Sequence, residues 1–276
     1  MLVRVAHYHP DMELRGRSVL LTGATGGLGQ AVARRLRDEG CELTLTGRRE
    51  DVLDALAQEV RGRVVVADLS QGPELQRVVE AAADVDILVA NAGVPGVGEL
   101  TEYSLEQLDR VIDVNLRVPI ALARLLGEGM LARGHGHVVF ISSLSGKTAN
   151  PVSSLYNATK FGLRGFALGL RQDWGPRGVG VSCVNPGPIA DAGMFHDATA
   201  GVALPAGFRP KLPSDVAAAV VRAIKSDRAE VDVADPVMRA GAFLGQVAPQ
   251  VAAKLNRVAG GDQVSHQIAE GAVDKR

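Results

Sequence analysis

Residues 18–29 read Ser-Val-Leu-Leu-Thr-Gly-Ala-Thr-Gly-Gly-Leu-Gly, an apolar run that enters a glycine-rich turn. After the turn, four apolar residues recur at helical spacing: Leu28, Ala31, Val32 and Leu36. A helix that begins at such a turn points its free backbone N–H groups at an anion, and glycine removes the Cβ that would block close approach. An ordinary tight turn is the alternative for this stretch alone. Its place at the first strand–helix junction of an alternating chain favours a phosphate-binding turn.

The alternation of short apolar runs and amphipathic stretches continues along the chain. Further strands are expected at 42–46, 64–67, 87–90, 138–141, 179–184 and 230–234, and the longer helices at about 105–126 and 156–174. Strands that are apolar on both faces and joined by crossover helices form a parallel sheet covered on both sides. The sequence therefore predicts a doubly wound α/β sheet of the Rossmann type, with three α/β/α layers, in a single domain over residues 1–276. Within it we expect a core at about 14–234, a substrate loop at about 190–213 and a helical tail at about 236–276.

Composition argues against several classes of protein. The 276 residues include 30 Lys and Arg against 31 Asp and Glu, and this balance argues against a nucleic-acid-binding protein. Cys41 and Cys183 are too few for a disulfide framework, and His135 and His137 lack a third metal ligand. No apolar run approaches the roughly 20 residues of a membrane span, and the N-terminus lacks the apolar region of a signal peptide. We expect a cytoplasmic protein with no bound metal.

A set of residues at the ends of the expected strands carries a family resemblance. The glycine-rich turn has the spacing TGxxxGxG, and further motif residues close the strands at 64–67 and 87–90. The residues of this pattern are Gly23, Gly27, Gly29, Asp68, Leu69, Asn91, Ala92 and Gly93. The pattern resembles the short-chain dehydrogenase/reductase family in its classical single-domain branch, from about Leu14 to Ala234. Gly26 also allows the GxxGxxG spacing of the extended branch, but the other segments and the chain length favour the classical one.

The resemblance implies a nicotinamide dinucleotide cofactor in the cleft at the strand ends. The pyrophosphate would lie on the glycine-rich turn, the adenine beside Asp68, and the nicotinamide under the Pro-Gly turn that follows residue 184. The residues implied in cofactor binding are Gly23, Thr25, Gly27, Leu28, Gly29, Arg48, Asp68, Leu69, Asn91, Ala92, Gly93, Tyr156, Lys160, Pro186, Gly187 and Ile189. Asp191 stands where the family often has Thr, so a hydroxyl that anchors the carboxamide is not expected there.

The end of the second expected strand predicts which cofactor is used. A carboxylate about 20 residues beyond the glycine-rich turn would bind the ribose 2′-OH of NAD. Gly47 stands at that place and Arg48 follows it, and a guanidinium suits a 2′-phosphate. We expect NADP(H) to be preferred over NAD(H). The alternative is that Arg48 and Arg49 are a solvated pair at the start of a helix.

A second set of residues carries the expected chemistry. Tyr156 and Lys160 lie one helical turn apart, so the lysine can stabilise a phenolate and lower the tyrosine pKa from its usual value near ~10. Ser143 ends the strand at 138–141, and the family's Ser, Tyr and Lys act together at this spacing. The resemblance implies that Tyr156 is the general acid or base and that Ser143, rather than Ser142, holds the substrate oxygen. It also implies that Lys160 binds the nicotinamide ribose.

Asn115 matches the family's asparagine that anchors a water between the lysine and solvent. Its alternative is a helix-interior amide that bonds backbone.

The expected reaction is hydride transfer between the cofactor and a ketone or a secondary alcohol. The loop at about 190–213 is rich in Gly and Ala and partly apolar, which favours a lid and an apolar substrate such as an acyl or polycyclic lipid. Two other functions stay open: a cofactor-binding regulator or sensor without turnover, and an epimerase or dehydratase that uses the bound cofactor.

The tail from residue 236 has apolar residues at near-helical spacing: Phe243, Leu244, Val247, Val251, Leu255 and Val258. A helix packed on its own domain or on a partner subunit is favoured. The alternatives are a helix that closes the pocket or docks on a membrane surface, for which Lys254 and Arg257 provide few basic residues. The resemblance implies a homodimer or a homotetramer.

Overall fold

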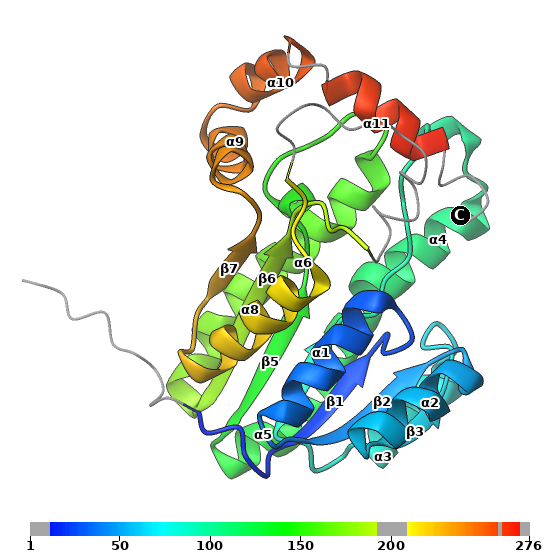
Figure 1. Cartoon of the computed structure of the whole chain (residues 1–276), viewed down its shortest axis with the longest axis vertical. Coiled ribbons are helices and arrows are strands. Elements are labelled where there is room, and N and C mark those ends of the chain that lie inside the picture. The colour runs from blue at the N-terminus through cyan, green and yellow to red at the C-terminus, as the bar shows by residue number, and fades with distance from the viewer. Residues whose placement is uncertain (1–11, 192–208, 259–260, 271–276) are drawn as a thin grey trace, which may run out of the picture.

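Seven strands form one parallel sheet in the computed structural model, which describes residues 12–191, 209–258 and 261–270 (Figure 1). The strands are β1 (Ser18–Thr22), β2 (Glu42–Gly47), β3 (Arg63–Val66), β4 (Ile87–Ala90), β5 (Gly136–Ile141), β6 (Val179–Pro186) and β7 (Glu230–Val233). Their order is β3-β2-β1-β4-β5-β6-β7, with every neighbouring pair parallel. The strand order reverses between β1 and β4: β2 and β3 lie on one side of β1, and β4 to β7 lie on the other. Sheets of this kind bind ligands in a crevice at this point, beyond the carboxyl ends of the strands. The predicted Rossmann-type fold is confirmed.

Helices cover both faces of the sheet. One core lies under α1 (Gly27–Asp38), α2 (Glu50–Val60) and α8 (Pro213–Lys225), and the other under α3 (Gly72–Ala81), α5 (Val118–Arg133) and α6 (Ser154–Trp174). Successive strand residues point to opposite faces, so in β1 Val19 and Leu21 join the first core and Leu20 joins the second. Burial on both faces thus explains why Val19, Leu20 and Leu21 are apolar at three successive positions of β1.

The helix expected at about 105–126 is interrupted. The structure has α4 (Leu105–Ile112), then a π-helical turn η2 (Asp113–Arg117), then α5. Residue 119 is proline, so Asn115 C=O lacks the N–H donor that an α-helix would supply at that position. The wider turn accommodates this break, and π turns are frequent at functional sites. Apolar residues keep their helical spacing on both sides of the π turn, so the sequence pattern did not reveal the interruption.

The expected tail forms three helices instead of one. They are α9 (Pro236–Val247), α10 (Pro249–Val258) and α11 (Gly261–Glu270), and Figure 1 shows them at the top, beyond the carboxyl end of β7. Met238 and Ala242 of α9 pack on Leu144 and Ala234, whereas α10 buries no residue. In the described part of the chain, no helix has the length and apolarity needed to cross a membrane.

The two ends of the expected substrate loop lie side by side. Ala190 N–H donates to Lys211 O at 2.8 Å, and Lys211 N–H donates to Pro188 O at 3.0 Å. Residues 192–208 of this loop lie outside the described residues. The segment therefore leaves and re-enters the body of the protein beside Ile189, on the wall of the cleft described below.

Candidate active site

A cleft of about 1620 Å³ lies along the carboxyl ends of the strands. This volume exceeds the roughly 300–1,000 Å³ of a typical small-molecule site, so there is room for a dinucleotide and a second ligand. Every residue that the sequence implicated in cofactor binding lines this cleft, as does Ser143. Asn115 is not among the lining residues. Residues of α9, α10 and α11 also line the cleft. From the sequence alone, a tail helix that closes the pocket is only an alternative.

The glycine-rich turn is a closely packed cradle. Gly23 has φ of +65°, which favours glycine, and a Cβ on Gly29 would overlap the Gly23 carbonyl oxygen. The Asn91 side-chain amide donates to Thr22 O at 3.0 Å and to Gly23 O at 3.1 Å. The Thr22 hydroxyl accepts the backbone N–H groups of Asn91 and Ala92, both at 3.0 Å. The turn is therefore braced against the end of β4, and its geometry fits a pyrophosphate at the start of α1.

The end of β2 shows why no acidic side chain stands there. A Cβ on Gly47 would lie 2.8 Å from Thr25 Cγ2, so the threonine side chain fills the space that a carboxylate would enter. Arg49 donates to Thr25 O. Arg48 is exposed, lines the cleft and makes no hydrogen bond or ion pair within the described residues. Of the two arginines, Arg48 is thus the one available to a ligand.

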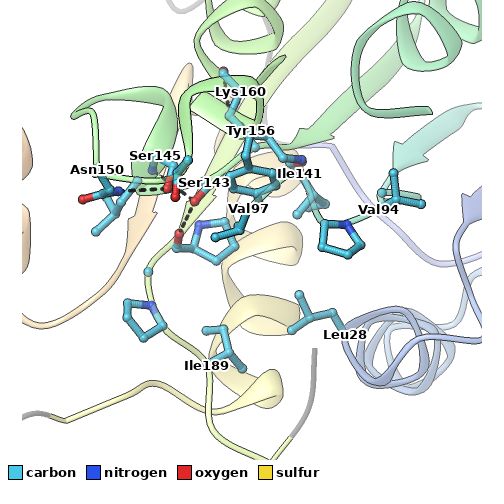
Figure 2. Close-up of a pocket in the computed structure, with 18 of the residues that line it drawn as sticks. Leu28, Val94, Val97, Ile141, Ser143, Ser145, Asn150, Tyr156, Lys160 and Ile189 are labelled. Atoms are coloured by element: carbon cyan, nitrogen blue, oxygen red, sulfur yellow. Dashed lines mark hydrogen bonds between the residues drawn. The ribbon is translucent and has the colours of Figure 1, made fainter. Parts of the chain in front are cut away.

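Ser143 projects its hydroxyl into the cleft at the end of β5. Its Oγ donates to Pro186 O at 3.3 Å and accepts Ser145 N–H at 3.0 Å. The neighbouring Ser142 also lines the cleft, but its hydroxyl is buried and donates to Lys160 O at 3.1 Å. Figure 2 shows Ser143, Ser145 and Asn150 together on one side of the Tyr156 ring.

Tyr156 and Lys160 lie on the same face of α6, one turn apart. Lys160 is buried, its Nζ donates to Ile141 O at 3.0 Å and lies 5.5 Å from the centroid of the Tyr156 ring. Burial lowers the pKa of Lys160 to about 8 and raises the pKa of Tyr156 to about 12, which a hydrogen bond with Ser143 partly offsets. In the protein alone the pKa of Tyr156 therefore lies above its usual value and not below it as expected, because removing the phenolate from water costs more than the neighbouring hydrogen bond returns.

Asn115 reaches the cleft only indirectly. Its Oδ1 accepts Val94 N–H at 2.8 Å and its Nδ2 donates to Val94 O at 2.9 Å, which is the backbone-bonding alternative. A Cβ on Gly93 would lie 3.3 Å from Asn115 Oδ1 and 4.0 Å from Lys160 Nζ. Asn115 and Lys160 thus flank Gly93. Because the Asn115 amide is already paired with Val94 and its backbone C=O lacks the N–H donor that residue 119 would supply, any water held by Asn115 would bind the backbone carbonyl.

Comparison with known proteins identifies the family. The family model described as short chain dehydrogenase matches residues 17–202. This chain belongs to the short-chain dehydrogenase/reductase family. The ketoacyl reductase HetN of Nostoc sp. is 32% identical over 274 residues, which cover 94% of this chain and 95% of that protein. Nodulation protein G of a Rhizobium species is 41% identical over 186 residues, covering 65% of this chain and 76% of that protein.

Solved structures of the family have the same fold. A short chain dehydrogenase/reductase family protein superposes with a TM-score of 0.74 at 31% identity, covering 80% of this chain and 97% of that one. The actinorhodin polyketide ketoreductase with NADPH gives a TM-score of 0.71 at 29% identity, covering 79% and 96%. This short-chain dehydrogenase/reductase is therefore an oxidoreductase acting on C=O and CH–OH groups, in a family that uses NAD(P).

A partly buried cluster of charges, with Lys147 at its buried centre, supports the Ser143 segment of this short-chain dehydrogenase/reductase. Lys147 Nζ lies 2.8 Å from Asp232 and 3.3 Å from Glu230, and Arg164 pairs with Glu230 at 2.6 Å. The Asn185 amide donates to both carboxylates, at 3.0 Å and 3.2 Å. The cluster joins the segment after β5 to β6, β7 and α6, and so fixes where Ser143 lies. Sequence reasoning missed it, along with Ser145 and Asn150, because no spacing pattern links these residues.

Proposed function

We propose that this chain is an NADP(H)-dependent ketoreductase that interconverts a ketone and a secondary alcohol on an apolar, acyl-type substrate. The observation that carries the proposal is the placement of Ser143, Tyr156 and Lys160 at one cleft, beside a turn shaped for a dinucleotide. HetN is named a ketoacyl reductase and a 34% identical relative in Rickettsia conorii a 3-oxoacyl-[acyl-carrier-protein] reductase, which supports a 3-oxoacyl substrate.

The residues divide the chemistry between them. The nicotinamide, when bound, supplies or accepts the hydride. Tyr156 donates its phenolic proton to the substrate oxygen during reduction and takes it back during oxidation. Ser143 turns its hydroxyl from Pro186 O to the substrate oxygen, where negative charge develops. Lys160 keeps a positive charge near the phenolate, and a water on the Asn115 backbone carbonyl returns the proton from solvent.

The walls of the cleft favour an apolar substrate. Figure 2 shows Val97 and Ile141 beside the Tyr156 ring, and Leu28, Val94 and Ile189 farther along the same cleft. Met238, Leu244 and Leu255 extend this apolar lining onto the tail helices. An elongated acyl chain could therefore run from the Tyr156 hydroxyl toward α9 and α10.

A substrate screen tests the proposal directly. 3-Oxoacyl thioesters of increasing chain length, and the matching 3-hydroxyacyl thioesters, are offered with NADPH or NADP⁺ while the NADPH absorbance is followed. Net NADPH consumption with the ketone is expected. Tight NADPH binding without turnover on any ketone or alcohol would indicate a cofactor-binding regulator instead. Conversion of a substrate without net change in NADPH would indicate an epimerase or a dehydratase.

Arg48→Asp is expected to lower the preference for NADPH over NADH by about ten- to a hundredfold, because hydrogen bonds to a charged group contribute about 1.5–3 kcal/mol. The carboxylate would also repel a 2′-phosphate and accept from a 2′-OH. The measurement is kcat/KM for both cofactors with the native chain and the variant. Arg177→Asp, an exposed arginine at the opposite end of the sheet, serves as the control. An unchanged ratio in Arg48→Asp would refute the assignment.

The rate of reduction should fall as the pH rises through about 8, the pKa of Lys160. Above this pH Lys160 loses the positive charge that stabilises the Tyr156 phenolate, so log kcat/KM should decline by about one per pH unit. A profile from about pH 6 to about pH 10 measures this. Lys160→Met has no charge to lose and should be slow without this decline. A native profile that stays flat across the range would contradict the role of Lys160.

We further propose a single cytoplasmic domain that assembles as a homodimer or homotetramer. One sheet contains all seven described strands, which supports the single domain. Sedimentation of the purified chain gives the number of subunits.

A further inference from the structure

The tail helices carry a row of apolar side chains that face solvent. We call this row the α9–α10 stripe. Its members, with their exposed fractions, are Phe243 (64%), Val247 (63%), Val251 (52%), Leu255 (55%) and Val258 (82%). Spacings of three and four residues put the members within each helix on one side of that helix. A helix of a folded domain normally buries such a side, and here it stays exposed.

The fold holds this stripe outward. The opposite side of α9 carries Ala242 and Met238, which pack on Leu144 and Ala234. Gly245 lies so close to the core that a Cβ there would overlap the Thr148 side chain. The helix therefore cannot roll to bury Phe243 without losing a close-fitting contact.

The charge around the stripe has one sign. Between residues 236 and 261 the chain has three basic residues and no acidic one. Arg257 pairs with Asp262 at 3.2 Å, whereas Arg239 and Lys254 form no ion pair with any residue that the structure describes. Arg239 precedes Phe243 by one helical turn, and Lys254 adjoins Leu255. Apolar side chains flanked by cations match the boundary between acyl chains and anionic headgroups.

We propose that the α9–α10 stripe docks on the surface of an anionic lipid bilayer. Figure 1 shows α9 and α10 at one end of the molecule, beyond the carboxyl ends of the strands. A second copy of this chain fits less well, because a two-fold contact through the stripe would bring Arg239 and Lys254 close to the same cations of the other copy.

Docking there would place the mouth of the cleft at the bilayer. Leu255 belongs to the stripe and also lines the cleft, so the stripe and the cleft meet at this residue, and the exposed Val237 at the start of α9 lines the cleft as well. An apolar substrate dissolved in the bilayer could pass between them without crossing water. This delivery step rests on the proposed ketoreductase function, whereas binding to the membrane does not.

Co-sedimentation with lipid vesicles tests the proposal without any turnover. The full chain is mixed with vesicles of phosphatidylcholine alone or of equimolar phosphatidylcholine and phosphatidylglycerol. Each basic residue near an anionic surface strengthens binding by about fivefold, so Arg239 and Lys254 should favour the mixed vesicles by at least about tenfold. High salt should reduce that difference, because it screens exposed charges.

Two pairs of variants separate the apolar and the charged contributions. Phe243→Asp should reduce binding at least about tenfold, whereas Leu105→Asp, at a more exposed leucine on α4, should not. Lys254→Glu should reduce binding to the mixed vesicles by at least about fivefold, whereas Arg177→Glu should not. The melting temperature and the affinity for NADPH should be unchanged in all four variants, which shows that they are folded.

Several results would overturn the proposal. These are absence of native binding to the mixed vesicles, equal binding to both kinds of vesicle, or an equal loss in variant and control. A dimer that Phe243→Asp dissociates, without vesicle binding by the native chain, would assign the stripe to a contact between copies. An acidic protein that binds the stripe, again without vesicle binding, would assign it to that partner. If the native chain binds the mixed vesicles but no substrate in the screen consumes NADPH, the membrane-docking proposal is supported and the ketoreductase function is refuted.

Discussion

Tyr156→Phe is expected to lower kcat for ketone reduction by roughly 10²–10⁴-fold, the usual contribution of a positioned general acid. The substitution removes the proton donor and keeps the ring, so the packing around Ile141 and Val97 is preserved. The measurement is steady-state NADPH oxidation, with NADPH affinity determined alongside by titration. The affinity should be nearly unchanged, because the glycine-rich turn, Arg48 and Lys160 would still bind the cofactor in the variant. Turnover within about tenfold of the native rate would refute the role of Tyr156.

Tyr103→Phe is the matched control. Tyr103 is buried outside the cleft, and its hydroxyl donates to Val97 O at 3.0 Å. Its removal should cost about 0.5–1.5 kcal/mol of stability and leave kcat close to native. A similar loss of kcat in both variants would show that Tyr156→Phe acts through the structure and not through the proton.

The pKa values of the two groups favour reduction near neutral pH. Burial holds the pKa of Tyr156 at about 12, so the phenol keeps its proton until a substrate oxygen becomes basic enough to take it. The pKa of Lys160 near 8 leaves the ammonium charged at pH 7. In the oxidative direction the enzyme would start from the unfavourable phenolate, so a more alkaline optimum is expected for alcohol oxidation than for ketone reduction.

The largest loss of stability is expected for Lys147→Met. This change leaves Asp232 with the Asn185 amide as its remaining partner, and Glu230 with Arg164 and the same amide. Breaking a buried ion pair costs about 3–5 kcal/mol, and the partial exposure of both carboxylates places this site near 3 kcal/mol. For a chain of this size the melting temperature should fall by about 6–12 °C. Calorimetry or thermal unfolding followed by circular dichroism measures it.

Arg124→Met provides the comparison for an exposed pair. Arg124 and Glu128 lie one turn apart on α5 with both side chains largely in solvent. Such pairs contribute about 0.3–0.5 kcal/mol, so the melting temperature should barely change. If Lys147→Met were no more destabilising than Arg124→Met, the partly buried cluster would not be a structural support of the Ser143 segment.

The sequence predicted the parallel sheet well because the determining signal is local. Apolar runs such as Ile87–Ala90 are buried on both faces, and each is short enough to be only a strand. Motif residues at the strand ends, such as Ser143 and Asn91, then meet at one edge because parallel strands all point the same way. The positions of the strands in the sequence were therefore enough to predict which residues lie together at the site.

The features that the sequence did not reveal depend on contacts between distant segments. Lys147, directly after η3 (Leu144–Gly146), meets Glu230 of β7 only through the fold, and no spacing rule connects the two residues. The π turn preserved the apolar period on both sides, so only Pro119 marked it. The pKa of Tyr156 depends on how deeply the phenol is buried, which the i, i+4 spacing to Lys160 does not report.

The direction of the strands has a practical consequence for engineering this enzyme. The amino-terminal edge of the sheet has its own buried polar contacts, including the Arg171–Asp227 ion pair at 2.7 Å and the His137–Ser182 hydrogen bond at 2.8 Å. None of these four residues lines the cleft. Substitutions that alter substrate range at the opposite edge should therefore leave these contacts intact, and their effects on stability should add to those of substitutions here, because the two sets share no partners.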